Sequence, residues 1–175
     1  MRVKSSARKA AFWGVLSALA LALSWAESFL APFLSLPMGV KPGLSNIAVM
    51  MACAVLGMPA GLAVAAAKAA FAGLTRGLTA MLLSGAGGIA SALLVGLLLK
   101  LRIANRELRI TEIGIGMIGG AAHNTAQLAV AALLMRAPGA LWAAPALLLC
   151  GAAAGAVTGT AVKLMRKVIR REAAL

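Results

Sequence analysis

Three polar side chains, those of His123, Asn124 and Gln127, stand close together in the otherwise apolar segment GGAAHNTAQLAVAALLM. Residues four positions apart share one face of a helix, so His123 and Gln127 align and Asn124 lies on their flank. Inside a membrane, such a stripe has two interpretations. It holds helices together, at about 1 kcal/mol for each hydrogen bond, or it lines a polar cavity. Three polar residues together favour the cavity.

The composition predicts that membrane helices carry this stripe. The chain has 175 residues, of which 62% are hydrophobic and 12% charged, and its mean hydropathy is +0.97. These values lie outside the range of soluble domains. The net charge of +13 does not form one basic face, because the lysines and arginines stand at the ends of apolar runs. We therefore expect no nucleic-acid partner.

The length of the apolar runs predicts six membrane spans. At roughly 20 residues per span they fall at about 10–30, 43–57, 59–76, 78–99, 111–135 and 140–163. The second and third are separated at Gly57-Met58-Pro59, and the count drops to five if this break fails. The first resembles a secretory signal, but we expect it to be an uncleaved helix because apolar sequence resumes at Phe29.

The positions of the basic residues predict the orientation. Most of the 17 lysines and arginines lie before the first span, between residues 100 and 109, or after residue 162. Six spans place all three groups on one side, which the positive-inside rule assigns to the cytoplasm. The sequence thus predicts an all-α integral membrane protein, a six-helix bundle with both termini cytoplasmic. Its single membrane domain covers residues 10–165, between basic tails at 1–9 and 166–175.

Polar residues in other spans are expected at a similar depth to the stripe. Lys68 lies within the third span, near the level of His123. Burying an ionisable side chain at this depth of the membrane costs free energy, so its presence there favours a functional role. Lys41 and Asn46 stand where the second span begins, Glu27 near the outer end of the first, and Arg76 at the end of the third. For Lys41 and Arg76, snorkelling to the headgroups is the alternative to ligand contact. A positive lining favours an anionic ligand, a carboxylate or a phosphate ester.

Small residues recur every four positions in the first and last spans. Gly151, Gly155 and Gly159 form a smooth ridge in the last span, where we expect packing inside the bundle. Gly14, Ala18, Ala22 and Ala26 form another in the first span. There, internal packing and docking of another protein are both open.

Enzymatic chemistry is not expected. The chain has no aspartate, and its four acids, Glu27, Glu107, Glu112 and Glu172, are scattered over different segments. Prenyl diphosphate synthases hold magnesium diphosphate with several carboxylates, which these residues do not bring together. The chain has no GxSxG segment, and no acid lies near His123 in the sequence. Neither signature of nucleophilic catalysis is therefore present. We predict no catalytic residue, no metal site and no cofactor.

Three motifs, KPGLSNI (41–47), LLSGAGG (82–88) and HNTAQ (123–127), resemble the Gx transporter family, whose older label is heptaprenyl diphosphate synthase component I. The resemblance runs from about residue 10 to 165. This family is similar in size and helix count to the S components of energy-coupling factor (ECF) transporters of the bacterial cytoplasmic membrane. That likeness implies an outward-facing pocket, and it makes Ala18 and Ala22 the docking residues for an ECF-type transmembrane subunit that works with ABC ATPases. The chain lacks the N-terminal histidine cluster of cobalt and nickel transporters, which argues against those metals.

The predicted function is therefore uptake of a small solute through a cavity. Its expected lining is His123, Asn124 and Gln127, with Asn46 at the rim and Lys41, Lys68 or Arg76 supplying positive charge. The alternative is a membrane-anchoring or accessory subunit of a polyprenyl diphosphate synthase or redox-cofactor pathway, in which the stripe only holds helices together. A third possibility is proton-driven transport through His123 and Lys68, without an ATPase.

Overall fold

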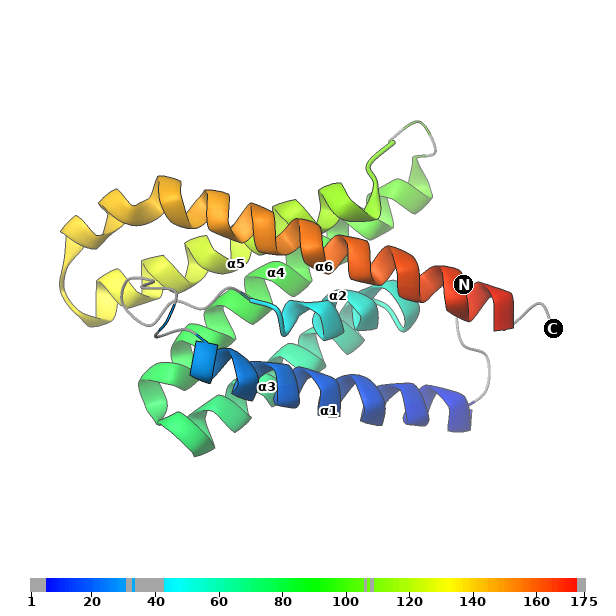
Figure 1. Ribbon diagram of the computed structural model, residues 1–175, viewed down its shortest axis with the longest axis horizontal. Coiled ribbons are helices and arrows are strands. Elements are labelled where there is room, and N and C mark those ends of the chain that lie inside the picture. Colours follow the sequence, from blue (N-terminus) through cyan, green and yellow to red (C-terminus); the bar gives the residue numbers. More distant parts are fainter. Residues whose placement is uncertain (1–5, 31–32, 34–42, 106, 108, 173–175) are drawn as a thin grey trace.

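Six α-helices make up most of the chain in the computed structural model, which describes residues 6–30, 33, 43–105, 107 and 109–172 (Figure 1). In chain order they are α1 (Ser6–Leu30), α2 (Asn46–Val55), α3 (Met58–Arg76), α4 (Leu78–Ala104), α5 (Glu112–Leu134) and α6 (Ala144–Glu172), and a 3₁₀ helix, η3 (Pro138–Ala143), precedes α6. These described residues contain no strand, which confirms the predicted all-α class.

Glycines separate α2, α3 and α4. Gly57 has a φ of 106° and Gly77 a φ of 87°, values that side chains with a Cβ rarely adopt. Pro59 then stands in the first turn of α3, where its missing N–H has no helical partner to lose. The break at Gly57-Met58-Pro59 therefore divides two helices, as the sequence predicts.

Four helical segments are long and apolar enough to cross a membrane: α1, α3, α4 and the segment Pro138–Val168, which joins η3 to α6. The 23 residues of α5 are also sufficient in length, but its polar stripe lowers its hydropathy. The predicted second span differs, because α2 has only 10 residues and extends about 15 Å, half of a bilayer core. Gly43 and Ser45, directly before α2, are already buried in the bundle.

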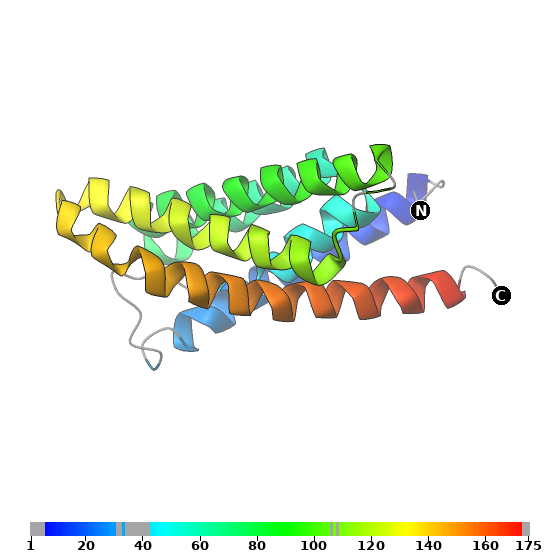
Figure 2. The same cartoon turned by 90° about the horizontal axis from the view of Figure 1, so that it is seen from above.

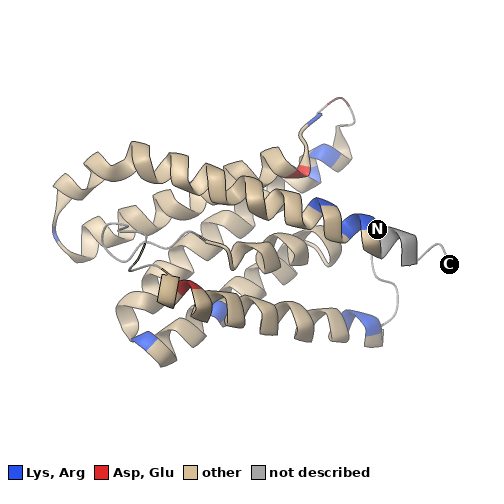
Figure 3. Cartoon of the chain, in the orientation of Figure 1, with Lys and Arg blue, Asp and Glu red and all other residues tan. Residues whose placement is uncertain are grey.

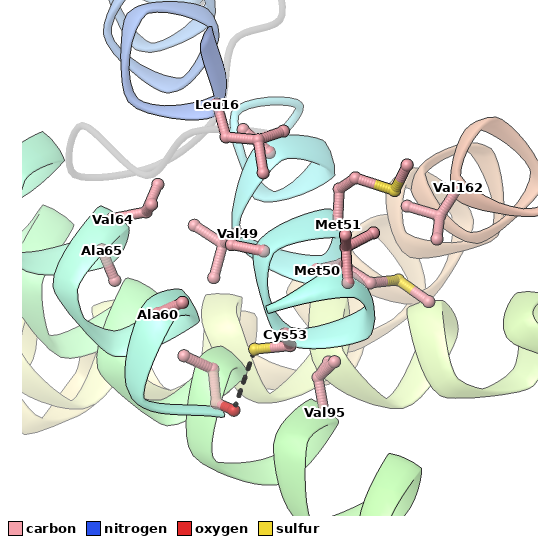
Figure 4. Packing of buried hydrophobic residues seen from close by; sticks show 14 of the residues in the cluster. Leu16, Val49, Met50, Met51, Cys53, Ala60, Val64, Ala65, Val95 and Val162 are labelled. Carbon is pink, nitrogen blue, oxygen red and sulfur yellow. Dashed lines mark hydrogen bonds between the residues drawn. The ribbon is translucent and has the colours of Figure 1, made fainter. Parts of the chain in front are cut away.

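The apolar core of the bundle surrounds α2. Eight of its ten residues are buried. Figure 4 shows Val49, Met50 and Met51 of α2 among side chains from four other helices. These include Leu16 of α1, Val64 of α3, Val95 of α4 and Val162 of α6. This apolar cluster fills the half of the bundle in which α2 lies.

Helices α5 and α6 lie side by side and make the closest contact in the bundle (Figures 1 and 2). A Cβ atom added at Gly120 would stand 3.0 Å from the Cα atom of Gly155, and one added at Gly116 would stand 2.8 Å from the backbone nitrogen of Gly159. Backbones that approach so closely leave no space for any side chain at these positions. We call the five glycines of this contact the seam: Gly116, Gly120, Gly151, Gly155 and Gly159. The last-span ridge packs inside the bundle, as expected.

Basic residues gather at the end of the bundle where α1 begins and α6 ends (Figure 3). Several of them are helical, because α1 starts at Ser6, α4 continues to Ala104 and α6 continues to Glu172. These helices therefore pass the predicted span limits. Lysine and arginine are good helix formers, and at a helix C-terminus they also offset the negative end of the helix dipole.

Candidate functional site

A cavity of about 420 Å³ lies between α1, α3, α4 and α5. Arg76, Thr79 and Met135 line it at one end of the bundle, where α3 ends and α4 begins. This end is opposite to the one where the basic residues gather (Figure 3). Lys68 and His123 line it near the middle of the bundle. Lys68 stands eight residues before Arg76 on α3, which corresponds to about 12 Å along the helix axis. The other lining residues are Ser24, Glu27, Ser45, Ala80, Leu83, Ser84 and Gln127.

Glu27 and Lys68 are joined through Ser45 beside this cavity. The carboxylate oxygens of Glu27 accept hydrogen bonds from the backbone nitrogen and the hydroxyl of Ser45, both at 3.1 Å. The Lys68 ammonium donates to the Ser45 hydroxyl at 3.1 Å and to the Asn46 side-chain oxygen at 3.2 Å. Both charged groups are almost fully buried, with exposures of 2% and 1%. Their opposite charges compensate each other across one shared residue.

The local backbone explains how Ser45 reaches this position. Gly43 has a φ of 82° and lies against His123, so that a Cβ atom there would stand 3.2 Å from the imidazole carbon Cδ2. The chain turns there, inside the bundle, and α2 begins directly after Ser45. The Glu27 carboxylate thus accepts from a backbone N–H at the N-terminal end of α2, where the helix dipole favours a negative charge.

Arg76 joins α3 to α1 at the end of the cavity where α3 ends. Its nitrogen Nη1 donates to the Ser28 hydroxyl at 2.5 Å and to the Ser24 carbonyl at 3.5 Å, and Nη2 donates to the Ser24 hydroxyl at 3.2 Å. All of these acceptors are neutral. The nitrogen Nε has no partner among the described residues. The guanidinium is therefore held in place while its charge is not paired with a carboxylate.

His123 and Gln127 form the α5 side of the cavity. The Gln127 amide nitrogen lies 3.0 Å from His123 Nε2, and an amide nitrogen only donates, so this imidazole nitrogen accepts. Gly87 of α4 makes the space for both residues, because a Cβ atom there would stand 2.6 Å from His123 Cε1 and 2.8 Å from Gln127 Cγ. The motif LLSGAGG therefore packs against HNTAQ, and its neighbour Gly88 lies against Ala65 and near Lys68.

The structure brings four of the predicted binding residues, His123, Gln127, Lys68 and Arg76, to one cavity. Two other predicted residues, Asn46 and Asn124, do not line this cavity. Asn46 accepts a hydrogen bond from Lys68 and lines a separate void of about 10 Å³. Asn124 turns to α6, where its amide nitrogen donates to the Leu147 carbonyl at 3.0 Å. Lys41 lies outside the described residues.

The polar side chains of α1 were not fully identified from the sequence. Ser24 and Ser28 stand four residues apart, with Glu27 between them, so the three share one side of an otherwise apolar helix. This spacing could have identified the two serines from the sequence. The predicted docking residues Ala18 and Ala22 lie on the exposed side of the same helix, together with Gly14 and Ala26.

The described residues include no group of three or more histidine, cysteine, aspartate or glutamate side chains that are placed to hold a metal ion. Glu27 is engaged by Ser45, and Glu112 pairs at 3.0 Å with both Arg102 and Arg166 near the basic end of the bundle. The two acids therefore occupy different parts of the protein.

Comparison with known protein families gives one match, which covers residues 16–165 and is described as heptaprenyl diphosphate synthase component I. The chain belongs to this family. The resemblance found in the three motifs is therefore confirmed under the older label. Neither the comparison with curated proteins nor that with solved structures finds a match.

The name heptaprenyl diphosphate synthase component I describes one part of a synthase rather than a catalytic unit by itself, and it implies a partner. Together with the four apolar helical segments, it indicates a membrane-associated, multi-pass component. The name does not describe a solute or a binding site.

Proposed function

We propose that this protein binds a small anionic solute in the cavity between α1, α3, α4 and α5 and passes it across the membrane with partner proteins. The observation that carries this proposal is the cavity itself, about 420 Å³ in volume and lined by two cations against one carboxylate. This volume lies within the range of small-molecule sites, about 300–1,000 Å³. A cluster that only held helices together would have neither the space nor the excess positive charge.

The basic end of the bundle supports an orientation in which the cavity faces outward. If this end lies in the cytoplasm by the positive-inside rule, then both termini are cytoplasmic and Arg76 stands on the outer side. The apolar cluster around α2 lies between Lys68 and the cytoplasmic end. The cavity is then closed on the inner side, as in a protein that captures its solute from outside a bacterial cytoplasmic membrane.

Transport from such a closed cavity needs a second component. The sequence has no glycine-lysine phosphate loop to bind ATP. The exposed small residues of α1, with Ala18 and Ala22 at their centre, form a face on which another membrane helix can approach closely. We propose this face as the docking site for an ECF-type transmembrane subunit with its ABC ATPases, as in S components.

The family name favours a second function, an accessory or membrane-anchoring subunit beside a catalytic prenyl diphosphate synthase subunit. Under this hypothesis the polar residues of α1, α3 and α5 stabilise the bundle and bind no solute. The two functions therefore differ in the proteins that accompany the chain and in the role of His123 and Gln127.

The deciding experiment is purification of the tagged protein from its native membrane, with mass spectrometry of co-purifying proteins and small molecules. We expect a transmembrane subunit, ABC ATPases and a small anion. Recovery of a prenyl diphosphate synthase subunit, with no solute and no ATPase, would contradict the transport proposal and support the accessory role.

Neighbouring residues of one motif supply matched variants for the same preparation. His123→Ala and Gln127→Ala remove the cavity side of α5 and should abolish recovery of the small anion while the protein stays folded. Asn124→Ala removes a hydrogen bond to α6, outside the cavity, and should cost about 1 kcal/mol of stability while the anion is retained. Equal loss of the anion in all three variants would show that the bundle, and not the cavity, had been disturbed.

A further inference from the structure

The charges that line the cavity are not equally available to a ligand. Both oxygens of Glu27 accept hydrogen bonds from Ser45, and Lys68 donates to the same serine. This carboxylate and this ammonium therefore compensate each other at the floor of the cavity. Arg76 hydrogen-bonds only to neutral acceptors on α1, and Glu27 acts on its charge from a greater distance. One carboxylate thus faces two cations, which leaves an excess of one positive charge.

The guanidinium of Arg76 keeps part of its donor set unused. A guanidinium has five N–H donors in a planar fork, and three hydrogen bonds to Ser24 and Ser28 occupy Nη1 and one side of Nη2. The Nε–H has no partner among the described residues. This N–H is buried, and in a guanidinium it shares one edge with an N–H of Nη2. Such an edge matches the two oxygens of a carboxylate or phosphate group.

The rest of the outer cavity is mainly apolar. Ala80 and Leu83 of α4 and Met135, which follows α5, line it together with Thr79 and Ser84. At the inner end Lys68 has three N–H donors, of which two bond to Ser45 and Asn46. A bound molecule thus meets an anion site at Arg76, a mainly apolar side wall, and the Lys68 ammonium about 12 Å deeper.

Resting on the function proposed above, we propose that the solute is a singly charged amphipathic anion, whose carboxylate-like group binds the guanidinium of Arg76 and whose apolar body lies against Leu83 and Met135. The two cations and one carboxylate of the lining leave an excess of one positive charge, which matches one negative charge. A doubly charged phosphate ester would bring two negative charges, one more than the excess positive charge of the described lining. Arg76 is then the residue that selects anions, and Lys68 is held in place by Glu27.

The test uses four probes with the same six-carbon body: hexanoate, hexyl phosphate, hexanol and hexylammonium. Thermal unfolding of the full chain in nanodiscs is followed at increasing probe concentration. We expect hexanoate to raise the Tm with a saturable dependence, hexyl phosphate to bind more weakly, and the other two to have no saturable effect. Hexanol also reports any effect that reaches the protein through the lipid, because it enters the bilayer without a charge.

Variants at Arg76 assign the selectivity. Arg76→Gln should weaken hexanoate binding at least about tenfold, and Arg76→Lys, which keeps the charge but not the fork, should fall between it and the parent chain. The matched control is Lys100→Gln, which removes one exposed charge of α4 at the other end of the bundle and should bind hexanoate as the parent does.

The outcomes separate this inference from the proposed function. Saturable binding of hexanol or hexylammonium as strong as that of hexanoate would overturn the inference, while a solute-binding cavity would still stand. Hexanoate binding unchanged in Arg76→Gln would likewise overturn it, even if the protein carries a solute when purified from its membrane. No binding by any of the four probes would also reject an amphipathic anion, and the proposed function would then be decided by the co-purified molecules alone.

Discussion

The cavity and the seam are both built where glycines meet polar or small residues, yet they differ in what the glycine faces. In the seam, glycines of α5 face glycines of α6, and the two backbones touch. At the cavity, Gly87 of α4 faces His123 and Gln127, so the space that glycine leaves is filled by large polar side chains. The comparison teaches that a glycine in a membrane helix closes an interface or accommodates a functional side chain, depending on its opposite neighbour.

The largest effect is expected in the seam, from Gly155→Leu. A Cβ atom at this position already collides with the backbone of Gly116, and no rotamer of a larger side chain relieves that contact. Overpacking of a core usually costs about 1–3 kcal/mol, and here it should exceed that range and prevent folding, because the collision is with backbone and α5 and α6 must separate. Size-exclusion chromatography of the detergent-solubilised variant should show loss of the peak of the folded protein. Ala153→Leu, on the exposed side of α6, is the control and should run like the parent chain.

At the cavity, the next largest effect is expected from Glu27→Gln. This change leaves Lys68 buried without the carboxylate that compensates it through Ser45, and loss of one partner of a buried charge pair costs about 3–5 kcal/mol. Unfolding by SDS in mixed micelles measures the loss. The double variant Glu27→Gln with Lys68→Met should recover a large part of it, because no unpaired charge is then buried. Additive losses would show that the two residues are independent.

Much of this contrast could be predicted from the sequence. Spacing of four residues placed Gly151, Gly155 and Gly159 on one ridge and His123 and Gln127 on one face, and the structure shows both. The direction of Asn124 could not be predicted, because helical periodicity gives the angle between neighbours but not which helix stands opposite each of them. The stripe is therefore divided, with His123 at the cavity and Asn124 bonded to Leu147 of α6.

The length of α2 also could not be predicted from the sequence pattern. The apolar run that begins near Gly43 is consistent with a longer span, and its start is fixed by a tertiary contact, the hydrogen bond from the Ser45 backbone to Glu27 of α1. The role of Ser24 and Ser28 depends in the same way on Arg76, 52 and 48 residues away along the chain. Contacts of such sequence separation leave no periodic signal in one sequence.

A smaller change sharpens the comparison at the cavity itself. Gly87→Ala places a Cβ atom 2.6 Å from His123 Cε1, so the imidazole has to move, at a cost of about 1–3 kcal/mol. Hexanoate binding should weaken as well, since His123 lines the cavity. Gly85→Ala is the matched control on the same helix, because its Cβ atom would make an ordinary contact of 3.5 Å with Ala69. Equal effects of the two alanines would mean that helix propensity, and not the opposite neighbour, decides.

The smallest effect is expected outside both regions, at Glu112. Its carboxylate accepts from Arg102 and Arg166 at 3.0 Å and links α4, α5 and α6 near the basic end of the bundle, but all three side chains keep about a fifth of their surface exposed, between 17% and 23%. Ion pairs that water and salt still reach contribute about 0–1 kcal/mol, less than a fully buried pair, because they are screened. Glu112→Gln should therefore lower the free energy of unfolding by less than about 1 kcal/mol, and less still in high salt. A loss as large as that of Glu27→Gln would contradict the view that burial, rather than the number of ion pairs, makes the cavity charges important.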